Sequence, residues 1–378
     1  MAKIGDVCAF KIDTLSAAYN GKIDYIDISA VDNREKKITQ TAIVLAKDAP
    51  SRAKQLVEHG DVIVSLVRPN LNAVAIIEEQ SQNLQVASTG YCVLRCNQMI
   101  YNRYLFYFCQ SETFVNSMTA QATGASYPAV SNSIVKNCEI PLPERNKQKE
   151  IADILDKVTG LISLRKQQLA KLDELVKARF VEMFGEPAAN PNRYKKKKLS
   201  EIAVYFNGLT YKPENVSDEG MIVLRSSNIQ NGKLDFEDVV RVDCAVKEKF
   251  VVKENDILMC SRNGSSRLVG KVALIKNVWE PMSFGAFMMI IRSDYYWYLM
   301  TYFQMASFRE QIKAGTTTTI NQITGRMLDS IMIPLPPVDV QNQFATFAER
   351  VDKQKQTVQQ SLEKLELMKK ALMQEYFG

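Results

Sequence analysis

The sequence contains a single histidine, His59, among 378 residues. Imidazole is the usual general base near neutral pH, so its scarcity excludes most catalytic designs built on a serine or cysteine triad. No apolar run approaches the roughly 18 residues that a membrane-spanning helix needs. The opening residues, MAKIGDVCAF, lack a basic stretch followed by a long apolar one, so no signal peptide is expected. We therefore expect a cytoplasmic protein with no membrane partner.

Cysteine is also sparse, with seven residues scattered over a long chain. An odd number at irregular spacing argues against a disulfide framework. Cys92 and Cys96 lie in an apolar, strand-like stretch, and His59 has no neighbouring ligand, so a zinc site is not expected. We expect reduced, mostly buried thiols and no bound metal.

Motifs for cofactor and nucleotide chemistry are missing too. The sequence has neither the glycine-rich loop and Asn/Asp-Pro-Pro-aromatic motif of an amino-methyltransferase nor a GxxxxGK[ST] phosphate-binding loop. A nuclease could use Asp27 with Glu35, Lys36 and Lys37, although so short a pattern arises easily by chance. The net charge of +6 is compatible with a nucleic-acid partner but does not require one.

The sequence does contain an internal duplication. Residues 140–143, Ile-Pro-Leu-Pro, recur at 333–336, and from there an ungapped alignment at an offset of 193 reaches the last residue, with 16 of 46 positions identical. The match extends upstream, where Asp61 and Asp256 begin similar strand-like runs. Repeats of this kind indicate a duplicated structural unit. The sequence therefore predicts the order domain, helix, domain, helix, over residues 1–143, 144–186, 187–336 and 337–378.

Apolar residues after each Ile-Pro-Leu-Pro motif recur at alternating steps of four and three, which is typical of a coiled-coil seam. A helix of about 40 residues is about 60 Å long and is not stable alone, so we expect the two copies to pair antiparallel. Four seam positions are charged and have no evident role: Arg165, Arg179, Lys355 and Lys369. The apolar seam consists of Ile151, Leu155, Val158, Ile162, Leu169, Leu172, Val176 and Met183, and of Phe344, Ala348, Val351, Val358, Leu362, Leu365, Leu372 and Tyr376.

A second apolar stripe lies beside the seam. It either widens the buried face or docks the helices of a partner, and the sequence favours neither interpretation. Its members are Ile154, Leu161, Leu175, Phe347 and Met368.

Each domain mixes short strand-like runs with an aromatic-rich helix. Strands are predicted at 61–67, 73–77 and 91–96, and at 221–224, 256–261, 271–275 and 287–292. One helix is predicted in each domain, at 101–119 and 295–313. The fold class is therefore α+β, with two mixed domains separated by a long antiparallel two-helix coiled coil and related by internal pseudo-two-fold symmetry.

Polar loops occupy similar places in both copies. Hydroxyl, amide and guanidinium groups suit contacts to base edges and phosphates, although any single such loop is more often merely solvated. The recurrence of these loops favours DNA contact. The candidates are Ser65, Arg68, Asn70, Asn72, Thr123, Ser126 and Tyr127 in the first domain, and Arg225, Ser227, Asn228, Arg262, Asn263, Ser265, Arg267, Thr317 and Thr318 in the second.

This arrangement resembles the DNA-specificity subunit of type I restriction–modification systems. The resemblance rests on IPLPERNKQKEIADIL and IPLPPVDVQNQFATFA, on the helix ends LDELVKARFVEMFG and LELMKKALMQEYFG, and on the upstream GDVIVS and NDILMC strands. It covers essentially the whole chain in the order domain, helix, domain, helix.

The resemblance implies a non-catalytic subunit with two target recognition domains, each reading half of a split site in double-stranded DNA. The helices act as a spacer and dock two methyltransferase subunits, which would bind S-adenosylmethionine, so this chain needs no cofactor. Whether restriction and translocation subunits join is left open. Because the two domains differ in sequence, we expect an asymmetric site. The alternatives are a nuclease or other DNA-modifying enzyme acting alone, and a coiled-coil assembly protein without a nucleic-acid role.

Overall fold

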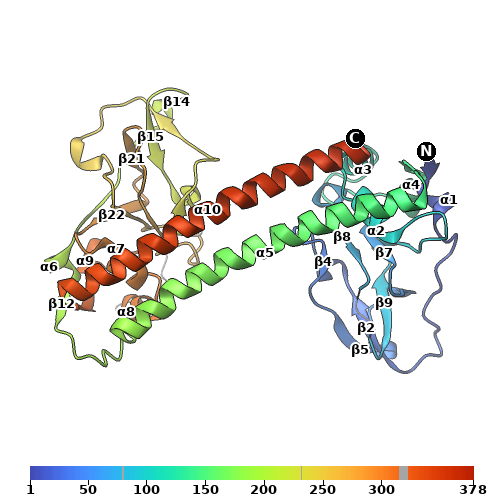
Figure 1. Ribbon diagram of the computed structural model, residues 1–378, viewed down its shortest axis with the longest axis horizontal. Coiled ribbons are helices and arrows are strands. Elements are labelled where there is room, and N and C mark those ends of the chain that lie inside the picture. Colours follow the sequence, from blue (N-terminus) through green and yellow to red (C-terminus); the bar gives the residue numbers. More distant parts are fainter. Residues whose placement is uncertain (79–80, 231, 315–321) are drawn as a thin grey trace. The chain divides into compact units, whose positions relative to one another are not determined.

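The computed structural model describes residues 1–78, 81–230, 232–314 and 322–378, which form two compact units. Unit 1 comprises residues 1–167 and 359–378, and unit 2 comprises residues 168–358. The two long helices, α5 (Arg145–Phe184) and α10 (Val338–Phe377), each contribute one part to each unit (Figure 1). Within the described ranges, no helix is both long and apolar enough to cross a bilayer.

Unit 1 contains a four-stranded sheet in the order β5-β2-β9-β6, in which β2 and β9 are parallel, and an antiparallel sheet in the order β10-β7-β8. Two short antiparallel pairs, β1–β11 and β3–β4, complete it. The strands are β1 (Ala2–Lys3), β2 (Lys22–Ile26), β3 (Val31–Asp32), β4 (Lys37–Ile38), β5 (Ala42–Leu45), β6 (Ala53–Leu56), β7 (Val62–Ser65), β8 (Val74–Ile76), β9 (Leu84–Ser88), β10 (Tyr91–Leu94) and β11 (Glu139–Ile140).

Two helices replace the single helix predicted at 101–119. The chain turns after α2, and the hydroxyl of Ser111 accepts a hydrogen bond from the Phe114 amide (3.2 Å), which caps the start of α3. A local cap of this kind ends one helical segment and begins another inside a continuous apolar pattern. The helices of this unit are α1 (Ile4–Val7), α2 (Asn102–Phe108), α3 (Glu112–Ala120) and α4 (Asn132–Asn137).

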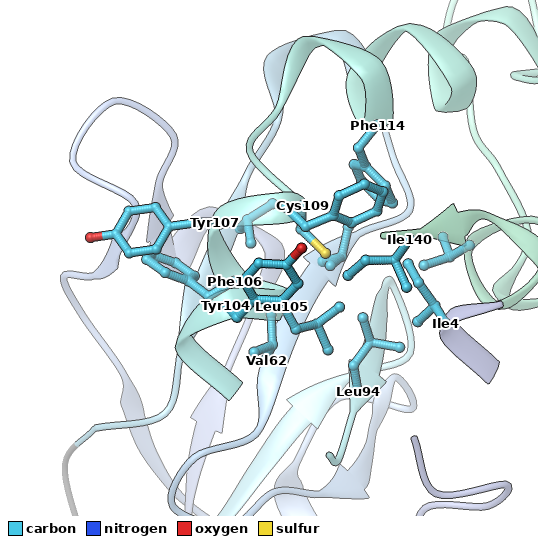
Figure 2. Packing of buried hydrophobic residues seen from close by; sticks show 14 of the residues in the cluster. Ile4, Val62, Leu94, Tyr104, Leu105, Phe106, Tyr107, Cys109, Phe114 and Ile140 are labelled. Atoms are coloured by element: carbon cyan, nitrogen blue, oxygen red, sulfur yellow. The ribbon is translucent and has the colours of Figure 1, made fainter. Parts of the chain in front are cut away.

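The core of unit 1 forms where α2 and α3 cover the β10-β7-β8 sheet. Leu105 and Phe114 pack with Val62 and Leu94 of this sheet (Figure 2). Tyr107 points away from this group, and its hydroxyl donates to Asp156 of α5 (2.7 Å). The core thus also fixes the start of the long helix.

Unit 2 contains two four-stranded sheets, β13-β22-β19-β20 and β14-β18-β15-β21, with β15 and β21 parallel. Its strands are β12 (Lys196–Lys198), β13 (Val204–Asn207), β14 (Val216–Ser217), β15 (Met221–Leu224), β16 (Ile229–Gln230), β17 (Lys233–Leu234), β18 (Arg241–Val242), β19 (Ile257–Cys260), β20 (Val272–Leu274), β21 (Met282–Phe284), β22 (Met288–Arg292) and β23 (Met332–Pro334). Its helices are α6 (Leu199–Ile202), α7 (Tyr296–Tyr302), α8 (Ala306–Ala314) and α9 (Gly325–Asp329). The helix predicted at 295–313 is again divided, between α7 and α8.

Short 3-10 helices occur in both units, at Ile28–Ala30, Ala46–Asp48, Pro69–Leu71, Pro213–Asn215, Ser226–Asn228 and Glu248–Phe250.

A buried ion pair recurs at the same place in both units. Asp61, 2% exposed, precedes β7 and accepts two hydrogen bonds from Arg95 (3.0 and 2.9 Å). Asp256, 1% exposed, precedes β19 and accepts two from Arg292 (2.7 and 2.6 Å). Each bidentate pair holds the start of the central strand against the end of its neighbour. The duplication therefore extends upstream of the Ile-Pro-Leu-Pro motifs in the structure as well as in the sequence.

The glutamine after each Ile-Pro-Leu-Pro motif serves the junction of strand and helix. The Gln148 side chain donates to the Pro143 carbonyl (2.9 Å) and accepts from the Tyr101 amide (2.8 Å). Gln341 donates to the Pro336 carbonyl in the same way (2.7 Å). Buried backbone groups need such partners, so these glutamines fix how each long helix leaves its domain.

The long helices pair antiparallel in both units. In unit 1, Phe377 at the end of α10 packs on Tyr104 and Phe108, with ring centroids 5.1 and 5.8 Å apart, beside the start of α5 (Figure 1). In unit 2, Phe184 at the end of α5 packs on Tyr298 (5.1 Å) and on Phe344 near the start of α10 (5.3 Å). Each helix thus starts from one domain and completes the core of the other with its terminal aromatic residue.

The charged seam positions have partners in this pairing. Arg165 donates to the Ser361 hydroxyl (3.2 Å), and Lys355 forms an ion pair with Asp173. The Arg179 guanidinium lies 5.9 Å from the ring of Phe347, and the Lys369 ammonium lies 5.8 Å from the ring of Tyr107. Arg179 also forms an ion pair with Glu182 (2.8 Å). Aromatic ring faces attract cations, so the ring of Tyr107 stabilises Lys369 beside the apolar seam.

Candidate nucleic-acid interface

Two loops of unit 1 meet at the end of β7. The amide of Val130 donates to the Leu66 carbonyl (2.9 Å), and the amide of Arg68 donates to the Pro128 carbonyl (2.7 Å). These backbone bonds join the loop after β7 to the loop before α4, although the two are far apart in the sequence. The structure thereby brings the predicted residues of both loops into one surface region.

Arg68 and Tyr127 form the centre of this region. The Arg68 backbone is left-handed (φ 49°), and its guanidinium lies 4.7 Å from the centroid of the Tyr127 ring, which is 57% exposed. Asn70, Thr123 and Ser126 are exposed nearby on the same two loops. We call Arg68, Asn70, Thr123, Ser126 and Tyr127 loop cluster 1. Its groups can donate to and accept from base edges and phosphates.

Two residues predicted for this surface are used internally. Ser65 is 5% exposed, and its hydroxyl donates to the Val67 carbonyl (3.1 Å). The Asn72 amide donates to the Cys109 carbonyl (2.8 Å) and accepts from Lys36 (2.7 Å). The polar atoms of Ser65 and Asn72 therefore satisfy the turn after β7.

Unit 2 repeats the same junction with other residues. The Ile323 amide donates to the Ser261 carbonyl (2.6 Å), as Val130 does to Leu66 in unit 1. The Arg262 guanidinium lies 5.4 Å from the ring of Phe287, which is 60% exposed. Phe287 was not among the predicted site residues. Its signal was an aromatic residue in the short Gly-Ala-Phe turn between two buried strands.

Asn263 shapes the rest of this surface. Its amide donates to the Ser226 hydroxyl (3.2 Å) and accepts from the Ser265 backbone amide (2.9 Å). Ser265 and Arg267 are exposed on the same loop. We call Arg262, Asn263, Ser265, Arg267 and Phe287 loop cluster 2.

The predicted group after β15 is mostly structural. Asn228 is 1% exposed and donates to the carbonyls of Asp235 (2.9 Å) and Asp238 (2.8 Å), so its side chain is used inside the domain. Arg225 forms an ion pair with Asp238 (2.8 Å), and Ser227 is half-buried. Thr317 and Thr318 lie outside the described residues.

Three of the four residues suggested for a nuclease have other partners. Asp27 accepts a hydrogen bond from the Tyr25 hydroxyl (3.1 Å), and Glu35 forms an ion pair with Lys166 (3.5 Å). Lys36 donates to Asn72, and burial, followed by repulsion from Lys369, lowers the Lys36 pKa to about 8. In the part of the chain that the structure describes, no cluster of three or more His, Cys, Asp or Glu side chains could hold a metal ion.

The second apolar stripe is mostly exposed on the helices. Ile154, Leu161, Leu175 and Met368 are 37, 45, 46 and 52% exposed, whereas Phe347 is half-buried beneath Arg179. Two neighbours that the stripe prediction omitted are more exposed still: Leu164 at 59% and Leu367 at 68%. Large apolar side chains gathered on a helix surface are typical of a docking face.

A model of one protein family matches nearly the whole chain. The type I restriction modification DNA specificity domain matches residues 1–174 and again residues 191–367. The chain belongs to this family. The double match agrees with the duplicated units. Proteins of this family recognise DNA sequence within type I restriction–modification complexes, and DNA recognition is the function of this specificity protein.

Known specificity subunits are similar to this chain over most of its length. The EcoKI specificity subunit of Escherichia coli is 24% identical over 364 residues, which cover 88% of this chain and 78% of that subunit. The MjaVIII subunit of Methanocaldococcus jannaschii is 26% identical over 315 residues, or 76% and 72% of the two chains.

Two solved structures show the same fold. A chain from a structure on the assembly and conformational transition of the type I R-M system aligns with a TM-score of 0.60 at 23% identity, over 100% of this chain and 96% of that one. The S subunit from M. genitalium aligns with a TM-score of 0.58 at 15% identity, over 100% and 95%.

Proposed function

We propose that each unit of this specificity protein reads one half of a split, asymmetric site in double-stranded DNA, through loop clusters 1 and 2. The observation that carries this proposal is the repeated junction, at which Leu66 and Ser261 accept equivalent backbone bonds. The side chains around the two junctions differ, so two similar frames present two different chemical surfaces. Direct base readout depends on such side chains, which favours two unlike half-sites.

The same proposal makes the chain a non-catalytic component. The domains at 1–143 and 187–336 would read DNA, while the helices at 144–186 and 337–378 would set the spacing and dock two methyltransferase subunits. The exposed stripe supports docking at two places, because Ile154 and Phe347, and Leu175 and Met368, are equivalent in the duplication. S-adenosylmethionine would be bound by those partners. Whether restriction and translocation subunits also join this complex is left open.

The decisive experiment purifies the chain together with the methyltransferase encoded beside it and maps methylated bases on DNA. We expect methylation at a two-part motif by the complex and none by either protein alone. Replacing residues 1–140 with those of another family member should change one half of the motif only. Methylation or cleavage by the chain alone, or a change in both halves after the swap, contradicts the proposal.

Docking is tested by the double variant Leu161→Glu/Met368→Glu. Both side chains are about half exposed, so the fold should persist while the charges prevent apolar contact with a partner. We expect loss of co-purification with the methyltransferase. Ile43→Glu, on an exposed strand residue of unit 1, is the matched control and should co-purify normally.

A further inference from the structure

Each loop cluster contains an arginine stacked against an exposed aromatic ring. Arg68 lies over Tyr127 and Arg262 lies over Phe287, at 4.7 and 5.4 Å from the ring centroids. Both rings are more than half exposed, which is uncommon for large aromatic side chains without a partner. The two pairs therefore stand on the surface rather than inside the core.

The two pairs are built differently at the same place. Arg68 follows Leu66 by two residues, and Arg262 follows Ser261 by one, at the repeated junction. Tyr127 comes from the loop before α4, whereas Phe287 comes from the turn between β21 and β22. The duplication alone therefore does not account for the shared combination of guanidinium and ring.

Stacking leaves the donor edge of a guanidinium available. The attraction acts through the face of the group, while its N–H donors lie in its plane. Within the described residues, neither guanidinium has a hydrogen-bonded or ionic partner, in contrast to Arg225, which is held by Asp238. An arginine so restrained pays less conformational entropy when it binds.

We propose that Arg68 and Arg262 each read a guanine, one in each half-site, by donating two hydrogen bonds to its O6 and N7 atoms. This inference rests on the proposed function of the two loop clusters. Guanine is the base whose major-groove edge offers two adjacent acceptors to the arginine fork. Tyr127 and Phe287 are positioning residues that hold the fork and do not themselves identify the base.

The test uses the complex with its methyltransferase on a DNA library in which the motif is randomised one position at a time. For Arg262→Ala, the preference for guanine at one position of one half-site should fall about 5- to 150-fold, the equivalent of about 1–3 kcal/mol. Arg68→Ala should have the same effect in the other half-site. Arg→Lys variants should lose the preference as well, because lysine keeps the charge but not the fork.

The two positioning residues, Tyr127 and Phe287, are tested by separate variants. Tyr127→Ala and Phe287→Ala should weaken the preference at the same position as their arginine, whereas Tyr127→Phe and Phe287→Tyr should retain it. Arg34→Ala, at an exposed residue of the β3–β4 turn, is the control and should leave the whole motif unchanged. Thermal melting and co-purification establish that each variant is folded and assembled.

The outcomes distinguish failure of the proposed function from failure of the guanine assignment alone. If the wild-type complex shows no two-part motif, the proposed function fails. If the motif exists but Arg68 and Arg262 variants leave every position unchanged, only the guanine assignment fails. If lysine restores methylation and the loss in the alanine variants is uniform over all sequences, the arginines contact phosphates, and the assignment is also overturned.

Discussion

The terminal aromatic residue of α10 should contribute strongly to the stability of unit 1. Phe377 is 2% exposed and packs on Tyr104 and Phe108. Phe377→Ala removes a buried ring and leaves a cavity, which costs about 3–5 kcal/mol in a well-packed core. Unit 1 has fewer than 200 residues, and for that size each kcal/mol lowers Tm by about 2–4 °C. We therefore expect the Tm of unit 1 to fall by about 6–20 °C.

The two units can be monitored separately. Both tryptophans, Trp279 and Trp297, belong to unit 2, so tryptophan fluorescence reports that unit while calorimetry reports both. Phe377→Ala should lower the Tm of a calorimetric transition more than the Tm measured by fluorescence. Phe184→Ala should mainly lower the Tm measured by fluorescence. Phe377→Leu, which retains most of the buried volume, should cost less than Phe377→Ala. An unchanged melting profile for Phe377→Ala, or equal effects of the two alanine variants on fluorescence, would refute the reciprocal packing.

Three further predictions concern buried polar groups. Asp256→Ala leaves Arg292 without its carboxylate and should lower the free energy of unfolding by about 3–5 kcal/mol, measured by urea denaturation; a loss below 1 kcal/mol contradicts the role of the pair. The Lys36 pKa of about 8 is lower than the roughly 10.4 of an unfolded lysine, so the unfolded chain binds more protons between these values. Wild-type stability should therefore rise from pH 8 to 10.4 relative to Lys36→Met, and parallel pH profiles would count against the burial of this amine. Cys8 and Cys96 are partners in an antiparallel bridge, and the usual Cα separation of about 4.5–5.5 Å in such pairs suits a disulfide, so the oxidant diamide should join them. Peptide mass analysis would show the bond, and capture of either thiol with another cysteine would contradict the register.

The duplication and the two long helices could be predicted from the sequence in detail. The four-and-three spacing places Leu155 and Phe344 on a buried face whatever the partner is, and both are fully buried. The strand after Asp256 was also predictable, because a short apolar run in this setting has few alternatives. The single helix predicted at 101–119, in contrast, is broken where Ser111 caps α3, and the role of Ser111 becomes visible only because the preceding helix ends there.

The charged seam positions could be found but not explained from the sequence. Lys355 is paired with Asp173 of the other helix, and Lys369 faces the ring of Tyr107 in the first domain. Neither partner is near in sequence, and neither follows from a heptad pattern. These two partners stabilise a cation beside an apolar seam, and only the tertiary structure shows which groups they are.

The sequence by itself determined the order domain, helix, domain, helix, the antiparallel pairing of the long helices and the family, because these depend on periodicity and repetition along the chain. Tertiary structure decided which polar loop residues remain available to DNA. Asn228 and Arg262 both looked suitable, yet Asn228 satisfies buried carbonyls while Arg262 lies exposed on Phe287. A polar side chain either pairs with the backbone or faces solvent, and that choice depends on atoms that are distant in the sequence.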